Sequence, residues 1–258
     1  MPRLKHFSRE HGTLQFCGST RQRKIGATVF TLRVNAYASR QSVLLARSFS
    51  GLVDDLRSAL AKPLPAGAAH ALMAPRPRRQ WPEGSSAATA RQAAGLLLVF
   101  PLDGHAHLVL TQRADTLGRH GGQISLPGGV IEPGEAFDHA ALREAHEEIA
   151  VDARHVRILG ALTPIDIPVS GFRLHPVVGV SDSRPPFAAA DGEVARILDV
   201  AVDDLMAPGA VISTSRERDG RQVAAPAFHV AGVEIWGATA MVLAEFLVML
   251  GWAGIGSE

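Results

Sequence analysis

The chain contains a single cysteine, Cys17, in 258 residues. One cysteine cannot form an intramolecular disulfide, and it cannot supply a cysteine-based zinc site. A reducing compartment is therefore expected, and the cytoplasm is the default location.

Long apolar runs are also missing. The most apolar stretch, residues 238–255, is interrupted by Glu245 and contains two glycines, and a membrane-spanning helix needs about 20 consecutive apolar residues. We interpret this stretch as a buried helix, with a membrane anchor as the weaker alternative.

Charge of one sign is not in excess, because 26 Lys and Arg residues face 25 Asp and Glu residues. A formal charge of +1 produces no global field that would favour nucleic acid. The partner is instead expected to be a small molecule recognised at a local site. The sequence leaves the oligomeric state open, a homodimer included.

Acidic residues are nearly absent from residues 1–49, where Glu10 is the only one. The basic residues there are Arg3, Lys5, Arg9, Arg21, Arg23, Lys24, Arg33, Arg40 and Arg47. Such a segment has too little apolar surface to offset chain entropy, so we expect a disordered basic extension. An organelle transit peptide is the alternative interpretation.

Residues 50–90 have a different pattern. Leu52, Val53, Leu56 and Leu60 are spaced for one face of an amphipathic helix, with Ser50 available as its N-cap. The proline-rich residues 62–88 predict an irregular connector, with Trp81 as an anchor.

Residues 91–258 are expected to form the compact domain. Two apolar runs, 95–101 and 107–113, flank Asp103-Gly104 and predict a hairpin. Further strands are predicted at 156–161, 175–181, 225–230 and 233–237, and helices at 137–150 and 238–250. Without strict alternation, this order favours a mixed sheet with helices packed on it.

The helix at 137–150 carries the most informative pattern. At 100° per residue, Glu144, Glu147 and Glu148 share about 100° of arc, with Leu142, Ala145 and Ile149 opposite. Like charges at this spacing repel by roughly a few tenths of a kcal/mol per pair unless a cation neutralises them. Oxygen donors alone suit Mg²⁺ or Mn²⁺, which also bind phosphate oxygens.

A solvated, Glu-rich helix face is the ordinary alternative. The residues before the helix argue against it, because Pro127-Gly128-Gly129 and Pro133-Gly134 predict a glycine-dependent loop that ends at the helix start. Such a loop can aim backbone carbonyls at the same ion.

This arrangement, Gly129, five residues, Glu135, seven residues and then Arg143-Glu144-x-x-Glu147-Glu148, resembles the Nudix box. The resemblance implies the Nudix fold, an α+β structure arranged as an α-β-α sandwich with a mixed β-sheet flanked by helices. It also implies metal ligation by Glu144, Glu147, Glu148 and the carbonyl of Gly129, and pairing of Arg143 with Glu135. Ala150 stands where the box normally has glycine.

A second motif precedes the box, running from Leu110 through Arg113 and His120 to Gly129. It resembles the signature of the coenzyme A pyrophosphatase branch of the Nudix family, with Leu126 in place of the usual aromatic residue. Coenzyme A carries a diphosphate and a 3′-phosphate, so cationic groups are needed beside the metals. Arg113, Arg119 and His120 are the candidates for these groups, although each could have only a structural role.

The leading hypothesis is metal-dependent hydrolysis of coenzyme A or acyl-CoA to 3′,5′-ADP and 4′-phosphopantetheine, with Glu148 or Glu193 as the general base. The alternatives are another Nudix substrate, such as ADP-ribose, NADH or a nucleoside triphosphate, and a catalytically inactive Nudix module that only binds.

Overall fold

The computed structural model describes residues 48–114, 122–218 and 220–255. The chain divides into two units, residues 1–43 and 44–258, and all described residues belong to the second. The basic segment expected to be disordered lies, up to residue 47, outside the described residues.

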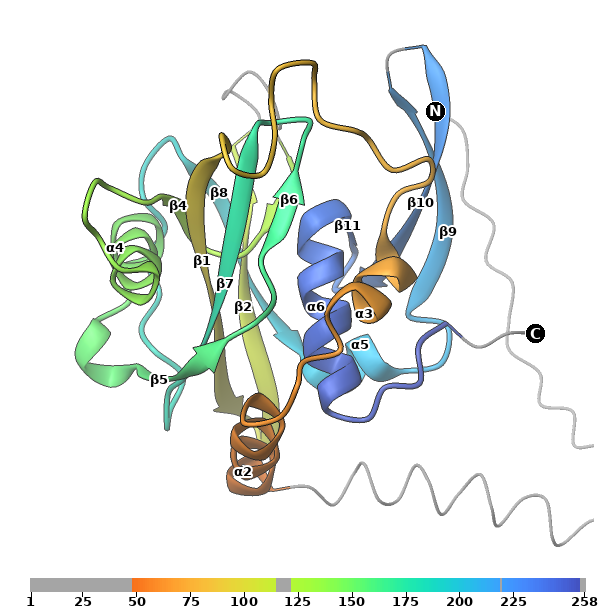
Figure 1. Ribbon diagram of the computed structural model, residues 1–258. Coiled ribbons are helices and arrows are strands. Elements are labelled where there is room, and N and C mark those ends of the chain that lie inside the picture. The colour runs from red at the N-terminus through yellow and green to blue at the C-terminus, as the bar shows by residue number, and fades with distance from the viewer. Residues whose placement is uncertain (1–47, 115–121, 219, 256–258) are drawn as a thin grey trace, which may run out of the picture. The chain divides into compact units, whose positions relative to one another are not determined.

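The larger sheet has eight strands (Figure 1). They are β1 (Arg91–Leu102), β2 (His105–Arg113), β3 (Ile124–Ser125), β4 (Gly128–Val130), β5 (Arg157–Ala161), β6 (Ile165–Ile167), β7 (Phe172–Val180) and β8 (Val194–Ala201). The main path is β3-β2-β1-β7-β5, with β8 paired to β2, β4 to β1 and β6 to β7. Among the paired strands of the described residues in this sheet, only the β1–β7 pair is parallel, so the predicted mixed sheet is confirmed.

The predicted hairpin is confirmed as well. Strands β1 and β2 pair from Val99↔Leu108 to Leu102↔His105, and the turn residues Asp103 and Gly104 both have positive φ angles. Asp and Gly tolerate this left-handed conformation better than other residues, which is why the pair was a strong turn signal.

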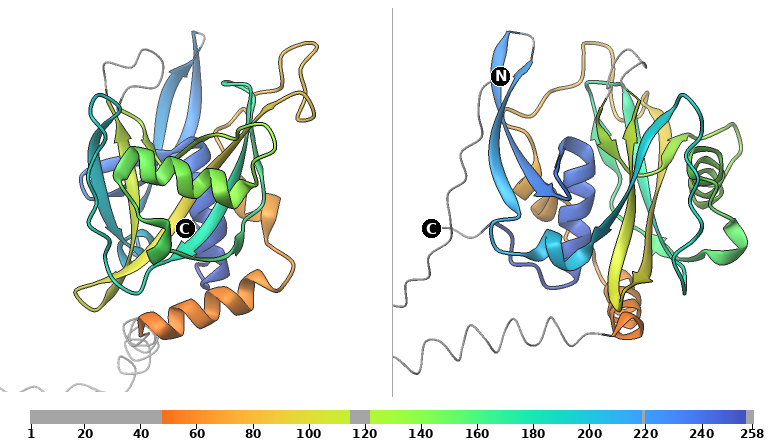
Figure 2. Two further views of the ribbon diagram at one scale, coloured as in Figure 1. Left: turned by 90° about the vertical axis from the view of Figure 1, so that its left-hand side faces the viewer. Right: turned by 180° about the vertical axis from the view of Figure 1, so that it is seen from behind.

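Helices cover both faces of this sheet. Helix α4 (Phe137–Ile149) lies on one face and α6 (Gly237–Met249) on the other, as Figures 1 and 2 show. Along β1, Leu96 and Leu98 belong to the apolar cluster under α4, whereas Leu97 and Val99 belong to the cluster under α6. Because successive side chains point to opposite faces, a strand buried on both faces has a continuous apolar run.

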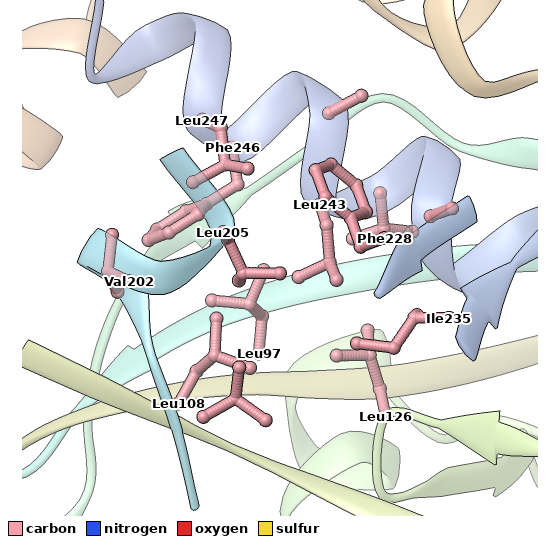
Figure 3. Packing of buried hydrophobic residues seen from close by; sticks show 14 of the residues in the cluster. Leu97, Leu108, Leu126, Val202, Leu205, Phe228, Ile235, Leu243, Phe246 and Leu247 are labelled. Atoms are coloured by element: carbon pink, nitrogen blue, oxygen red, sulfur yellow. The ribbon is translucent and has the colours of Figure 1, made fainter. Parts of the chain in front are cut away.

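A second, three-stranded sheet packs against α6. It consists of β9 (Val211–Arg218), β10 (Arg221–Val230) and β11 (Val233–Trp236) in the order β11-β10-β9. Residues of α6, α5 (Val202–Met206) and both sheets meet in the core shown in Figure 3. A short 3-10 helix, η1 (Ala153–His155), follows α4.

The apolar stretch near the C-terminus is a buried helix, as predicted. Within it, the fully buried carboxylate of Glu245 accepts hydrogen bonds from the backbone of Ala66 and Thr163 and from the side chains of His70 and Thr163, at 2.6–3.2 Å. These hydrogen bonds offset the free-energy cost of burying the carboxylate. No helix in the described part of the chain is both long enough and apolar enough to span a bilayer.

Two expectations for the upstream segment were wrong. The first helix, α2 (Phe49–Leu60), begins earlier than predicted, and its N-cap is Ser48, whose Oγ accepts from the Gly51 N–H at 3.1 Å. The proline-rich connector is also not wholly irregular, because residues 66–73 form α3 (Ala66–Met73). Leu56 and Met73 are fully buried, so both helices contribute to the core on the α6 side of the large sheet.

Candidate metal and phosphate site

Helix α4 supplies the acidic residues and ends at Ile149, one residue before the predicted boundary, with Ala150 as its C-cap. Ala150 adopts the left-handed conformation, with φ 58° and ψ 28°. Its N–H donates to the carbonyl of His146, and the N–H of Val151 donates to that of Ala145. The alanine therefore terminates the helix with the geometry that glycine usually provides, at a steric cost.

The three glutamates do not share one exposed face, contrary to the expectation. The side chain of Glu147 is 57% exposed and that of Glu144 17%, whereas Glu148 is buried at 6%. Glu148 lies at the border of the apolar face, only about 60° from Ala145 on the helical wheel. Its carboxylate turns inward and accepts from the N–H of Gly128 at 3.1 Å.

Two consecutive glycines let strand β4 approach β1 and the acids. A Cβ at Gly128 would lie 2.6 Å from the Cα of Gly95 and would also collide with the carbonyl of Ala94. A Cβ at Gly129 would lie 2.5 Å from Cδ and 2.7 Å from Oε1 of Glu144. Real Cβ atoms do not come this close, so Gly128, which meets backbone, requires glycine, whereas a side chain at Gly129 would displace the Glu144 carboxylate.

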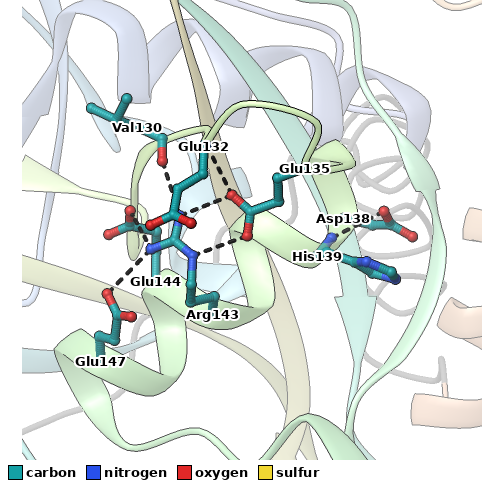
Figure 4. A network of polar contacts seen from close by, with 8 residues as sticks. All are labelled: Val130, Glu132, Glu135, Asp138, His139, Arg143, Glu144 and Glu147. Atoms are coloured by element: carbon teal, nitrogen blue, oxygen red, sulfur yellow. Dashed lines mark hydrogen bonds and ion pairs between the residues drawn. The ribbon is translucent and has the colours of Figure 1, made fainter.

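Arg143 connects the helix to the preceding loop (Figure 4). It donates to both oxygens of Glu135 at 2.9 and 3.0 Å, to Glu144 at 2.9 Å, to Glu147 at 3.2 Å and to the carbonyl of Val130 at 3.0 Å. A guanidinium has five N–H donors, so these five bonds use all of them. The hydrogen bonds to Arg143 hold the pKa of Glu135 well below its usual value.

Acidic side chains gather at the buried end of the site. Burial, followed by the charges of Glu193 and Glu144, raises the pKa of Glu148 to about 7, and burial also raises the pKa of Glu144. Carboxylates taken out of water and placed beside one another resist ionisation until a cation compensates them.

The acids fit a divalent metal in chemistry but are not drawn together in this structure. Among the described residues, no three acidic, His or Cys side chains are arranged to hold a metal ion. The guanidinium of Arg143 lies against Glu144 and Glu147 instead. The fit rests on the metal ligands available. The Glu144 carboxylate lies against the backbone of Gly129, and the buried Glu148 carboxylate accepts one hydrogen bond, from an amide N–H. Both supply the oxygen ligands that hard cations prefer.

Arg113 lies beside this acidic group. At the end of β2, its guanidinium is 3.8 Å from the carboxylate of Glu193, and both side chains are about half exposed. The backbone is well anchored, because the Ala114 N–H donates to the Glu193 carbonyl and the Arg113 N–H to that of Gln123. Arg119 and His120, the other predicted phosphate-binding residues, lie outside the described residues.

The loop that follows β7 closes the end of α4 and carries Glu193, one of the two residues predicted as the general base. There, the N–H of Ala188 donates to the carbonyl of Ile149, and that of Ala190 to the carbonyl of Glu148. These bonds bring Glu193 to the acidic group. Since donors and acceptors are all backbone groups, no side-chain motif marks these hydrogen bonds in the sequence.

Comparison with known proteins gives consistent matches. A model described as the NUDIX domain matches residues 89–216. An uncharacterized Nudix hydrolase, NudL, of Cronobacter sakazakii is 34% identical over 169 residues, which cover 64% of this chain and 86% of the relative. NudL of Salmonella paratyphi B is 35% identical over 164 residues, covering 62% and 83%. Among solved structures, RenU, a Nudix hydrolase from M. Smegmatis, matches with a TM-score of 0.46 and 20% identity, covering 66% of this chain and 91% of RenU.

Proposed function

The chain belongs to the Nudix hydrolase family, and from this premise we propose that it hydrolyses the diphosphate of coenzyme A and of acyl-CoA. The products are 3′,5′-ADP and 4′-phosphopantetheine or its acylated form. The acidic group around Glu144 and Glu148, against Gly128 and Gly129, is the observation that carries the proposal.

Nudix hydrolases generally use divalent cations, and here Glu144, Glu147, Glu148 and the carbonyl of Gly129 would hold Mg²⁺ or Mn²⁺. When bound, the metal polarises the diphosphate and lowers the pKa of a coordinated water. Arg143 would keep its pairing with Glu135, which joins the loop to the helix, and release Glu144 and Glu147 to the metal.

In the reaction, the oxygen of water forms a bond to one phosphorus, the bond from that phosphorus to the bridging oxygen breaks, and a carboxylate takes the proton of the water. Glu148 and Glu193 are the two candidates for this base. We favour Glu193 as the base because its side chain is about half exposed, whereas Glu148 is buried and already accepts a hydrogen bond from the Gly128 N–H. In Glu193→Gln, we expect a loss of about 10²–10⁴-fold in kcat and of the acidic limb of the pH–rate profile. An unchanged profile would assign the role to Glu148.

Arg113 would bind a phosphate of the substrate. The 3.8 Å contact of Arg113 with Glu193 is too long for a hydrogen bond. Its guanidinium can therefore turn to a phosphate and bind it with two parallel hydrogen bonds.

We propose coenzyme A as the substrate, and not another diphosphate, because the motif from Leu110 to Gly129 resembles that of the coenzyme A pyrophosphatase branch. Other nucleoside diphosphate derivatives, such as ADP-ribose or NADH, remain the alternative substrates. An inactive binding module is disfavoured, because a site released from catalysis has no reason to keep mutually repelling acids.

A competition assay tests the proposal. Coenzyme A, NADH and ADP-ribose are mixed at equal concentration with the full chain and Mg²⁺, and the loss of each is followed by chromatography. We expect coenzyme A to disappear first. Cleavage of NADH or ADP-ribose with coenzyme A intact would overturn the substrate assignment, and no cleavage with no effect of Mg²⁺ on stability would favour the binding module.

A further inference from the structure

The helix that carries the acids begins without a side-chain cap. Its N-cap position is Ala136, which makes no capping hydrogen bond, although Ser, Thr, Asp or Asn usually fills this position. The first helical residue, Phe137, is 46% exposed despite its large apolar ring. That ring stacks on the imidazole of His175 in β7, with centroids 3.9 Å apart and planes 14° from parallel.

The imidazole is itself held in one orientation. His175 Nε2 lies 2.7 Å from Oε1 of Gln92, whose Nε2 donates to the carbonyl of Ala90 at 2.8 Å. Since the amide nitrogen of Gln92 is directed to Ala90, His175 donates from Nε2. Burial and the charge of Arg173 lower the pKa of His175, which favours the neutral ring. Phe137 therefore packs on a fixed, uncharged surface.

The sheet and the helix match in spacing. Gly129, Ala94 and His175 are paired neighbours across β4, β1 and β7, so their side-chain positions lie in one row on the same face. Two strand spacings separate Gly129 from His175 by about 10 Å. On α4, Phe137 and Glu144 are seven residues apart, which is also about 10 Å, and they point within about 20° of the same direction.

Helix α4 thus lies along the row, with Phe137 over His175 and Glu144 over Gly129. Ala140 and Ala141, between the two contacts, are fully buried and have no side chain long enough to interlock with the sheet. Small side chains interlock weakly with a sheet, so the stack of Phe137, together with Leu142 and Ile149 in the same cluster, contributes to the position of the helix.

We propose that Phe137 is a positioning residue: its stack on His175 fixes α4 along the row and so holds Glu144 against Gly129 and Glu148 beside the Gly128 N–H. The inference rests on the proposed function, because it assigns Phe137 a role through the metal-binding acids. Phe137 itself touches neither metal nor substrate in this account.

Binding of Mn²⁺ to the full chain, measured by electron paramagnetic resonance, tests this without turnover. F137L removes the ring but keeps an apolar side chain, and F137Y keeps the ring. We expect F137L to weaken Mn²⁺ binding about tenfold, the low end for groups that support metal ligands. We expect F137Y to bind within about twofold of the wild type.

F228L is the matched control, because it makes the same change at a fully buried position in the cluster on the opposite face of the sheet. It should lower the melting temperature more than F137L does but leave Mn²⁺ affinity within about twofold. Equal Mn²⁺ affinity in F137L and wild type, or an equal loss in F228L, would overturn the inference alone. A wild-type chain that binds no Mn²⁺ would contradict the proposed metal site, and the inference with it.

Discussion

The carboxylate of Glu144 lies directly against the backbone of Gly129, in the space that a side chain at residue 129 would occupy. Gly129→Ala would therefore displace Glu144 from its position over β4. We expect diphosphate hydrolysis to fall by at least about 100-fold, because small displacements of this kind are costly in catalysis. Steady-state assays at saturating Mg²⁺ measure the loss.

Gly67→Ala is the control for this substitution. Gly67 lies in α3, where a Cβ would meet nothing within 4 Å, so we expect unchanged activity. If Gly129→Ala were as active as Gly67→Ala, Glu144 would not need its position against the glycine.

Arg113→Ala should separate recognition from chemistry. If Arg113 binds a substrate phosphate, KM for coenzyme A should rise about tenfold or more while kcat changes little, since charge-assisted hydrogen bonds contribute about 1.5–3 kcal/mol. Dephospho-coenzyme A identifies the phosphate involved: an effect that disappears with this substrate assigns Arg113 to the 3′-phosphate. A fall in kcat at constant KM would instead show that Arg113 stabilises the transition state and not the bound substrate.

Glu148 should make the metal-free protein less stable as pH rises. Its folded pKa of about 7 exceeds the ordinary value of 4.5, so the folded state holds the proton more tightly and loses stability between these pH values. In EDTA, we expect Glu148→Gln to be more stable than wild type at pH 8, by on the order of 3 kcal/mol at most, and equal below pH 4.5. Glutamine keeps an acceptor for the Gly128 N–H.

Urea denaturation at several pH values gives this difference. Parallel stability profiles for the two proteins from pH 4.5 to 8 would show that Glu148 ionises normally in the folded chain.

Ala150→Gly should stabilise the protein. Ala150 has a left-handed conformation that costs a non-glycine residue about 1–2 kcal/mol, partly offset by the greater entropy of glycine in the unfolded chain. We expect a net gain of about 0.5–1 kcal/mol in the free energy of unfolding. Ala150→Val should be less stable than the wild type. If Ala150→Gly were also less stable than the wild type, the left-handed conformation of Ala150 would not be strained.

Local patterns were sufficient for the parts of the fold whose burial follows a period. The run at 95–101, the hairpin turn at Asp103-Gly104 and the acidic helix were all predictable, because each contains its own signal. Strand β9 was not, since its sequence VISTSRER is largely polar and only its pairing with β10 makes it a strand.

The site was predictable in composition but not in arrangement. Spacing placed Glu144, Glu147 and Glu148 on one helix, but a helical wheel cannot tell whether a residue at the border of the apolar face turns inward, as Glu148 does. The approach of Glu193 depends on backbone bonds from a loop distant in sequence, and the stack of Phe137 on His175 joins residues 38 positions apart. Such contacts depend on the tertiary fold.

Identification of the products formed from coenzyme A tests the central claim most directly. The full chain is incubated with coenzyme A and either Mg²⁺ or EDTA, and the products are identified by mass spectrometry. We predict 3′,5′-ADP and 4′-phosphopantetheine in equal amounts with Mg²⁺ and neither with EDTA. Intact coenzyme A after prolonged incubation with Mg²⁺, under conditions in which the same preparation cleaves ADP-ribose or NADH, would contradict the account.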